Sequence, residues 1–129
     1  MNTEEKKGFL LLKSVIFHYH GLDYEEQKKL EDSATTLDAK DELQWANRFI
    51  SQDYYTAFDR ARKYLKDIMG SLSKEKKLSY LESLWKEVCE KGYITEMEAA
   101  ALLKVAKDWD VEMELITLVK ETTASALTA

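Results

Sequence analysis

The sequence contains no proline and only one cysteine, Cys89, among its 129 residues. A single cysteine excludes a disulfide within these residues and a zinc site built from cysteines, and it fits a reducing compartment. Without proline, no position forces a helix to break, so glycines are expected to mark the helix ends instead. Three of them, Gly21, Gly70 and Gly92, stand where the helical spacing of apolar residues stops. The sequence therefore predicts helices whose ends are set by glycine.

Long apolar runs and excess positive charge are also missing. The apolar runs 9–12 and 15–17 are separated by Lys13 and Ser14 and are far shorter than the roughly 20 residues that span a bilayer. No small-residue cleavage site follows the charged first residues, so we expect a cytoplasmic protein without membrane insertion. A net charge of −5 argues against nucleic-acid binding, which depends on neutralising phosphates with lysine and arginine.

Apolar residues make up 45% of the chain and charged residues 33%, which is typical of a globular protein. Apolar residues recur at helical spacing in about seven stretches, so we predict an all-α fold, a single compact bundle over residues 1–129. The stretch 4–20 has the broadest apolar face and is predicted to be a central, buried helix. We expect the small and polar residues 121–129 to fray.

Five residues have the side chains and positions of helix N-caps. They are Asp23, Asp38, Ser73, Thr95 and Asp110. Thr95 is followed three residues later by Glu98, which is the pattern of a capping box. A further helix is predicted over 52–69.

The turns around Gly21 and Gly92 resemble each other. With one residue inserted after the glycine, Asp23 aligns with Thr95, Glu26 with Glu98 and Asp38 with Asp110. We interpret residues 9–38 and 80–110 as two copies of one helix-turn-helix unit. The alternative is chance, because capped amphipathic helices resemble one another.

The repeated pattern of glycine, aliphatic residue, capping residue, two spacers and glutamate resembles the TerB-like family, which is linked to tellurite resistance. The resemblance covers approximately residues 9–120. It implies a compact fold of about seven helices, a cytoplasmic location in bacteria, no established catalysis and an acidic metal-binding cluster. The family's turn is usually Asp-Gly, whereas His20 and Lys91 precede the two glycines in this chain.

Asp23, Glu26 and Glu98 are candidate ligands for a divalent cation, because carboxylate oxygens are the ligands that hard cations prefer. This reading requires the two repeats to face each other. In the alternative reading, the same acids cap their helices and are stabilised by the helix dipole.

Evidence for catalysis is sparse. His18 aligns with Cys89 in the repeat, so an imidazole and a thiol are candidates for a cryptic enzyme or metal carrier, but both residue types also pack at helix interfaces. The sequence contains no glycine-rich phosphate loop, no His-Glu-x-x-His pair and no nucleophile elbow. We expect a chain that is not an enzyme and needs no cofactor.

Aromatic residues gather around the junction of the helices predicted on either side of position 52. Trp45, Tyr54 and Tyr55 are candidates for contact with a protein partner or a second copy of the chain, since aromatic residues anchor interfaces. Tyr54 and Tyr55 are adjacent, so one of them should face away from the core. The nearby basic residues Arg60, Arg62, Lys63 and Lys66 are interpreted as a solvated helix face. The expected function is a non-enzymatic interaction or stress-response module, with metal binding as the alternative.

Overall fold

The computed structural model describes residues 2–18, 23–90 and 92–128, with only the backbone described from 122 to 128. Within these ranges it contains seven α-helices and no strand, which confirms the all-α prediction. The helices are α1 (Thr3–Phe17), α2 (Tyr24–Thr36), α3 (Lys40–Ser51), α4 (Ala57–Met69), α5 (Lys74–Cys89), α6 (Glu96–Asp108) and α7 (Glu112–Thr128). The chain divides into two compact units, residues 1–71 and 72–129. That the two units make up one domain stays a prediction.

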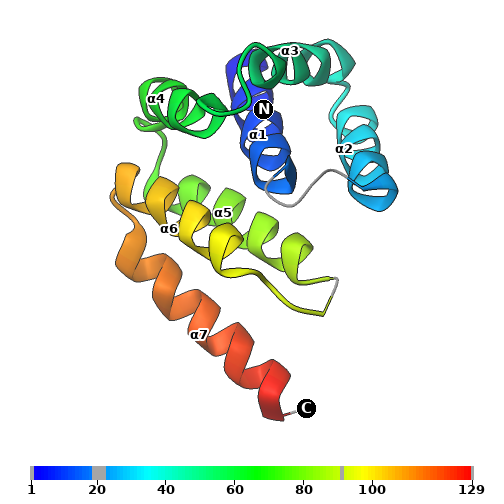
Figure 1. The fold of residues 1–129 in the computed structure, drawn as a ribbon. Helices are drawn as coiled ribbons and strands as arrows, with labels where there is room; N and C mark the ends of the chain where they lie inside the picture. The colour runs from blue at the N-terminus through cyan, green and yellow to red at the C-terminus, as the bar shows by residue number, and fades with distance from the viewer. Residues whose placement is uncertain (1, 19–22, 91, 129) are drawn as a thin grey trace. The chain divides into compact units, whose positions relative to one another are not determined.

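Unit 1 is built around α1, which contacts α2, α3 and α4 (Figure 1). Every residue of α1 from Gly8 to Phe17 is buried, which confirms the predicted central helix. The helix ends at Phe17 rather than at His20. The predicted turn at Gly21 lies outside the described residues.

The buried stretch of α1 includes a charged side chain. Lys13 is 2% exposed, and its Nζ donates a hydrogen bond to Ser33 Oγ on α2 at 2.5 Å. The same nitrogen lies 5.8 Å from the ring centre of Phe9 and 5.9 Å from that of Phe17. Contacts between an amine and aromatic faces are attractive, so both rings help to hold the Lys13 side chain in place. Lys13 thus links α1 to α2 without reaching water.

Unit 2 consists of α5, α6 and α7, and each pair of these helices is in contact (Figure 1). Its helix starts agree with the sequence, because Ser73 caps α5 and Thr95 caps α6 through their side-chain oxygens. Gly92 has a φ of +96°, a conformation that side-chain-bearing residues rarely adopt, which confirms its predicted role in the turn. Helix α7 continues to Thr128, and the fraying of residues 121–129 stays a prediction.

The prediction that Asp38 and Asp110 are N-caps is wrong. Their φ values are 52° and 59°, so both are left-handed residues just beyond the ends of α2 and α6. The amide of Ala39 donates to the carbonyl of Ala34 at 2.7 Å. The amide of Val111 donates to the carbonyl of Ala106 at 2.9 Å. This is the hydrogen-bond pattern of a Schellman motif, in which one left-handed residue ends a helix.

The two units therefore share local structure at aligned positions. Asp23 is the N-cap of α2 and Thr95 is the N-cap of α6, each through its side chain. A left-handed aspartate follows the end of both helices. These similarities are local, and internal duplication stays a prediction. No helix among the described residues combines the length and the apolar character needed to cross a bilayer.

Candidate functional site

The predicted metal ligands take part in helix capping. Asp23 Oδ1 accepts a hydrogen bond from the amide of Glu26 at 2.8 Å. Glu98 is fully buried, and its Oε1 accepts from the amide of Thr95 at 3.0 Å and from its hydroxyl at 2.8 Å. Together with the bond from the Glu98 amide to Thr95 Oγ1, these contacts form the predicted capping box. The capping alternative thus accounts for Asp23 and Glu98.

Asp23 and Glu26 lie in unit 1 and Glu98 lies in unit 2. Across the described part of the chain, no three histidine, cysteine, aspartate or glutamate residues gather as a metal-binding group. The divalent-cation site stays a prediction. Cys89 is the last residue of α5 and is half-buried.

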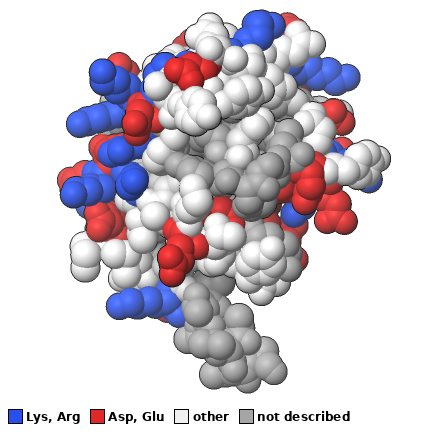
Figure 2. Space-filling view, viewed as in Figure 1, with Lys and Arg blue, Asp and Glu red and all other residues white. Residues whose placement is uncertain are grey.

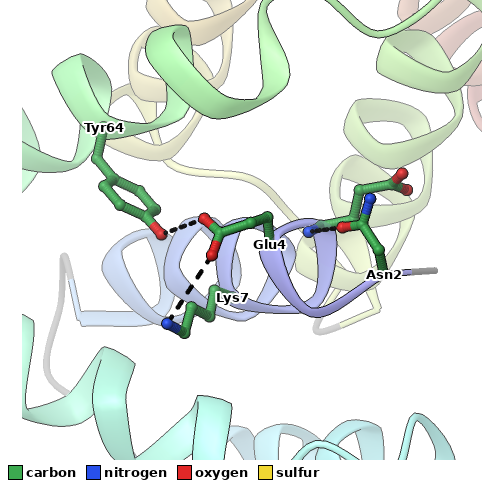
Figure 3. A network of polar contacts seen from close by, with 5 residues as sticks. Asn2, Glu4, Lys7 and Tyr64 are labelled. Carbon is green, nitrogen blue, oxygen red and sulfur yellow. Dashed lines mark hydrogen bonds and ion pairs between the residues drawn. The ribbon is translucent and has the colours of Figure 1, made fainter.

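Trp45 belongs to an aromatic cluster between α3 and α4. Its ring centre lies 5.5 Å from that of Phe49 and 5.0 Å from that of Tyr64, and Lys7 Nζ lies 5.3 Å from it. Figure 3 shows the polar side of the cluster, where the Tyr64 hydroxyl donates to Glu4 Oε2 at 3.1 Å. Burial, reinforced by the hydrogen bond and the negative charge of Glu4, raises the pKa of Tyr64 to about 12. Half-buried Trp45 thus packs within unit 1.

Tyr54 and Tyr55 lie together on the connection between α3 and α4. Residues 52–56 are not helical, so the helix predicted over 52–69 begins at Ala57 instead. The sequence predicted that one of the two would face away from the core, and in the structure both are exposed, Tyr54 by 64% and Tyr55 by 100%. We call residues 52–56 the tyrosine loop.

Arg60 holds the tyrosine loop in place from the first turn of α4. Its guanidinium donates to the carbonyl of Phe49 at 2.9 Å and to that of Asp53 at 2.8 Å, and its Nε donates to Thr56 Oγ1 at 2.9 Å. Asp53 Oδ1 accepts from the amide of Tyr55 at 3.0 Å. The sequence interpretation placed Arg60 on a solvated face and missed this role.

Tyr54 also forms one wall of a small apolar pocket. The pocket has a volume of about 120 Å³ and is lined by Val15, His18, Ile50, Tyr54, Ala57 and Phe58. These residues come from α1 and its cap, α3, the tyrosine loop and α4, all within unit 1. The His18 ring is fixed by a contact of 2.7 Å between its Nδ1 and the carbonyl of Ser14, and its centre lies 6.2 Å from that of Tyr54.

No family model, curated protein or solved structure matches the chain. The function therefore has to be argued from the chemistry of the chain's own residues.

A second hollow lies between α2 and α3. It has a volume of about 400 Å³ and is lined mostly by polar side chains. Several of them are engaged with one another, since Gln27 Nε2 donates to Glu31 Oε1 at 3.1 Å and the Thr35 hydroxyl donates to the carbonyl of Glu31 at 3.0 Å. These groups do not point to a particular ligand, so the pocket beside Tyr54 is the better candidate.

The pair of Lys13 and Ser33 has the geometry of a base next to a nucleophile. Ser33 lines neither of the two pockets. We therefore interpret the pair as a structural link between α1 and α2.

Charge is mixed on the surface. On the face drawn in Figure 2, lysine and arginine side chains lie among aspartate and glutamate side chains instead of forming an extended area of one sign. Helix α4 follows the same pattern, because Asp59 and Asp67 are interleaved with its basic residues. Because charges of opposite sign lie close together, we expect the electrostatic attraction of a partner to the candidate site to act only over short distances.

Proposed function

We propose that the chain is a non-enzymatic protein-interaction module of the TerB-like kind, and that the tyrosine loop is its contact surface. The observation that carries the proposal is the exposure of Tyr54 and Tyr55 on neighbouring positions of one loop. Tyrosine is enriched among the residues that dominate binding energy at protein interfaces. Two adjacent exposed tyrosines therefore suit a contact with another protein.

The anchoring of the loop supports the same proposal. Arg60 and Asp53 bind the backbone and side chain of the tyrosine loop, so little freedom remains to be lost when a partner binds. Binding by a pre-organised loop costs less entropy than binding by a loose one. The loop is thus suited to present its tyrosines in one arrangement.

The resemblance to the TerB-like family points to a cytoplasmic role in a stress response, without catalysis. The partner in this proposal is another protein or a second copy of the chain. The alternative of a metal-binding protein has less support, because Asp23 and Glu98 already accept hydrogen bonds in helix caps.

Site-specific crosslinking in the cells of origin tests the proposal. A photoreactive phenylalanine derivative replaces Tyr55 in one variant and Asp41, an exposed residue of α3, in the matched control. We expect a discrete protein adduct from position 55 that is absent from position 41 and is weakened by Tyr54→Ala. An adduct with a second copy would identify a homo-oligomer. The same adducts from both positions, or none from position 55, would refute the proposal.

A further inference from the structure

Helix α2 buries few of its side chains. Of its 13 residues, Leu30 and Ala34 are buried. The other helices of unit 1 bury more, since α3 buries three residues, α4 buries four and α1 buries eleven. Burial of apolar surface is the main force that holds a helix against its neighbours. Leu30 is thus the one large apolar side chain buried along α2, all of whose residues the structure describes.

The side chains at the edges of the α2 contact are polar. The half-buried residues of the helix are Glu26, Gln27, Lys29 and Ser33. Tyr24, the one aromatic residue of α2, is 82% exposed. When a helix moves away, its polar side chains exchange contacts with the protein for contacts with water, so each of them adds little to the attachment. The attachment of α2 therefore depends on a small apolar contact.

A hydrogen bond ties α2 to the buried part of α1. Ser33 Oγ accepts it from Lys13 Nζ, and Lys13 is 2% exposed. Water can replace Ser33 as the acceptor once α2 has moved away, so breaking this bond costs less than leaving the amine buried without it. The buried amine thus favours the attached helix and still tolerates its departure.

The remaining helices of unit 1 are also in contact with one another. Helix α1 contacts α3 and α4, and α3 contacts α4 (Figure 1). The large apolar side chains that α3 and α4 bury are Leu43, Ile50, Leu65 and Met69. These contacts do not involve α2 and can persist without it. Segments with few buried apolar contacts open at a lower free energy than the rest of a protein.

We propose that α2 is a lid of unit 1, which separates from α1 and α3 as one unit while α1, α3 and α4 stay packed. The hydrogen bond between Lys13 and Ser33 helps to keep the lid closed. Opening uncovers the side of α1 that carries Lys13, so water reaches the amine. The inference does not depend on the tyrosine loop, which connects α3 to α4.

Native-state hydrogen exchange of the full chain, followed by NMR, tests the lid. A detached helix of 13 residues is marginal in water, so its amides exchange once the lid is open. We expect the amides of Leu30 and Ala34 to be protected at least about tenfold less than those of Ala46 in α3 and Leu65 in α4.

Urea distinguishes the opening of the lid from the unfolding of the whole unit. Low urea concentrations should accelerate exchange in α2 less steeply than in α3 and α4, because the lid exposes less surface when it opens than the whole unit does when it unfolds. Equal protection and equal urea dependence in the three helices would overturn the inference, since α2 would then open only together with the rest.

Two variants weaken the attachment of the lid. Ser33→Ala removes a partner of Lys13, and we expect exchange in α2 to become about fivefold faster or more while exchange in α3 and α4 changes by less than about twofold. Leu30→Ala reduces the apolar contact and should accelerate exchange in α2 by about tenfold or more.

Asp32→Ala is the matched control for Ser33→Ala. It also raises helix propensity at a central position of α2, but Asp32 is exposed. This variant should not accelerate exchange in α2. If Ser33→Ala and Leu30→Ala accelerate exchange equally in all helices of unit 1, or if Asp32→Ala accelerates exchange in α2 as much as Ser33→Ala does, the lid is refuted.

Discussion

At the scale of single residues, Asp38 and Asp110 adopt a left-handed conformation that glycine favours and most other residues avoid. Aspartate tolerates it better than alanine does, because its short polar side chain can bind the local backbone. Both residues end helices within Schellman motifs. The strain at each position is therefore small but measurable.

Replacing Asp38 or Asp110 by glycine and by alanine measures that strain. At both positions we expect the glycine variant to be more stable than the alanine variant by about 1 kcal/mol, since glycine has no Cβ to clash at positive φ. Asp32, an exposed residue within α2, is the matched control. There the alanine variant should be more stable than the glycine variant by about 1 kcal/mol. Urea unfolding measures the difference in unfolding free energy between the glycine and the alanine variant at each of the three positions. A difference of the same sign at all three would contradict the prediction.

Tyr64 makes the stability of unit 1 vary with pH in the alkaline range. Its pKa is raised from 10.0 to about 12, first by burial and then by Glu4. Between these values the folded chain keeps a proton that the unfolded chain has lost. The stabilisation is thus complete below pH 10 and disappears as the pH rises to about 12.

The difference in unfolding free energy between the wild type and Tyr64→Phe should therefore shrink over this range. Tyr55→Phe is the control, because Tyr55 is fully exposed. Its difference from the wild type should stay constant with pH. Chemical unfolding at a series of pH values provides the measurement, and a Tyr64→Phe difference that does not change between pH 10 and 12 would contradict the prediction.

At the scale of elements, α1 and α4 approach each other at Gly8. A Cβ built on Gly8 would overlap Met69 Sδ and would lie 3.2 Å from Ile68 Cδ1. Met69 is fully buried, so its side chain has little room to move aside. The missing side chain of Gly8 thus lets the central helix of unit 1 pack against α4.

Gly8→Ala is expected to destabilise the chain by about 1 kcal/mol, because an overpacking cost of about 1–3 kcal/mol exceeds a helix-propensity gain of about 1 kcal/mol. In a Met69→Ala background the overlap is removed. The same substitution should then be neutral or stabilising by up to about 1 kcal/mol. A double-mutant cycle of unfolding free energies measures this coupling. Equal effects of Gly8→Ala in both backgrounds would contradict the predicted contact.

At the scale of the whole molecule, the sequence predicted those features that depend on neighbouring residues. The broad apolar face of α1 indicated its burial, and Ser73, Thr95 and Glu98 fixed two helix starts through bonds of short sequence range. The all-α fold follows from these local signals. The N-cap prediction for Asp38 and Asp110 was wrong because aspartate is a favoured N-cap residue and both stand at the junction of two helices, where the sequence alone does not say which helix they belong to. Backbone hydrogen bonds show that each aspartate follows the end of the preceding helix and does not cap the next one, and the sequence pattern does not reveal these bonds.

The candidate site was less predictable, because it depends on contacts between distant residues. The sequence offered Tyr54 and Tyr55 only as candidates for a contact surface, and the helix that it predicted from position 52 begins at Ala57. Arg60 binds carbonyls as far back as Phe49, and no local pattern indicates that. The pocket needs residues as distant as Val15 and Phe58. Only the packing of α1 against α3 and α4 brings such residues together.

The burial of Lys13 has a consequence for the chemical reactivity of the chain. Acylating reagents attack amines that they can reach, and Lys13 is 2% exposed while Lys40 and Lys63 lie on the surface. The surface lysines react in the folded state, whereas Lys13 must wait until α1 separates from its neighbours. The rate at which its amine is acylated would therefore report how often the centre of unit 1 opens.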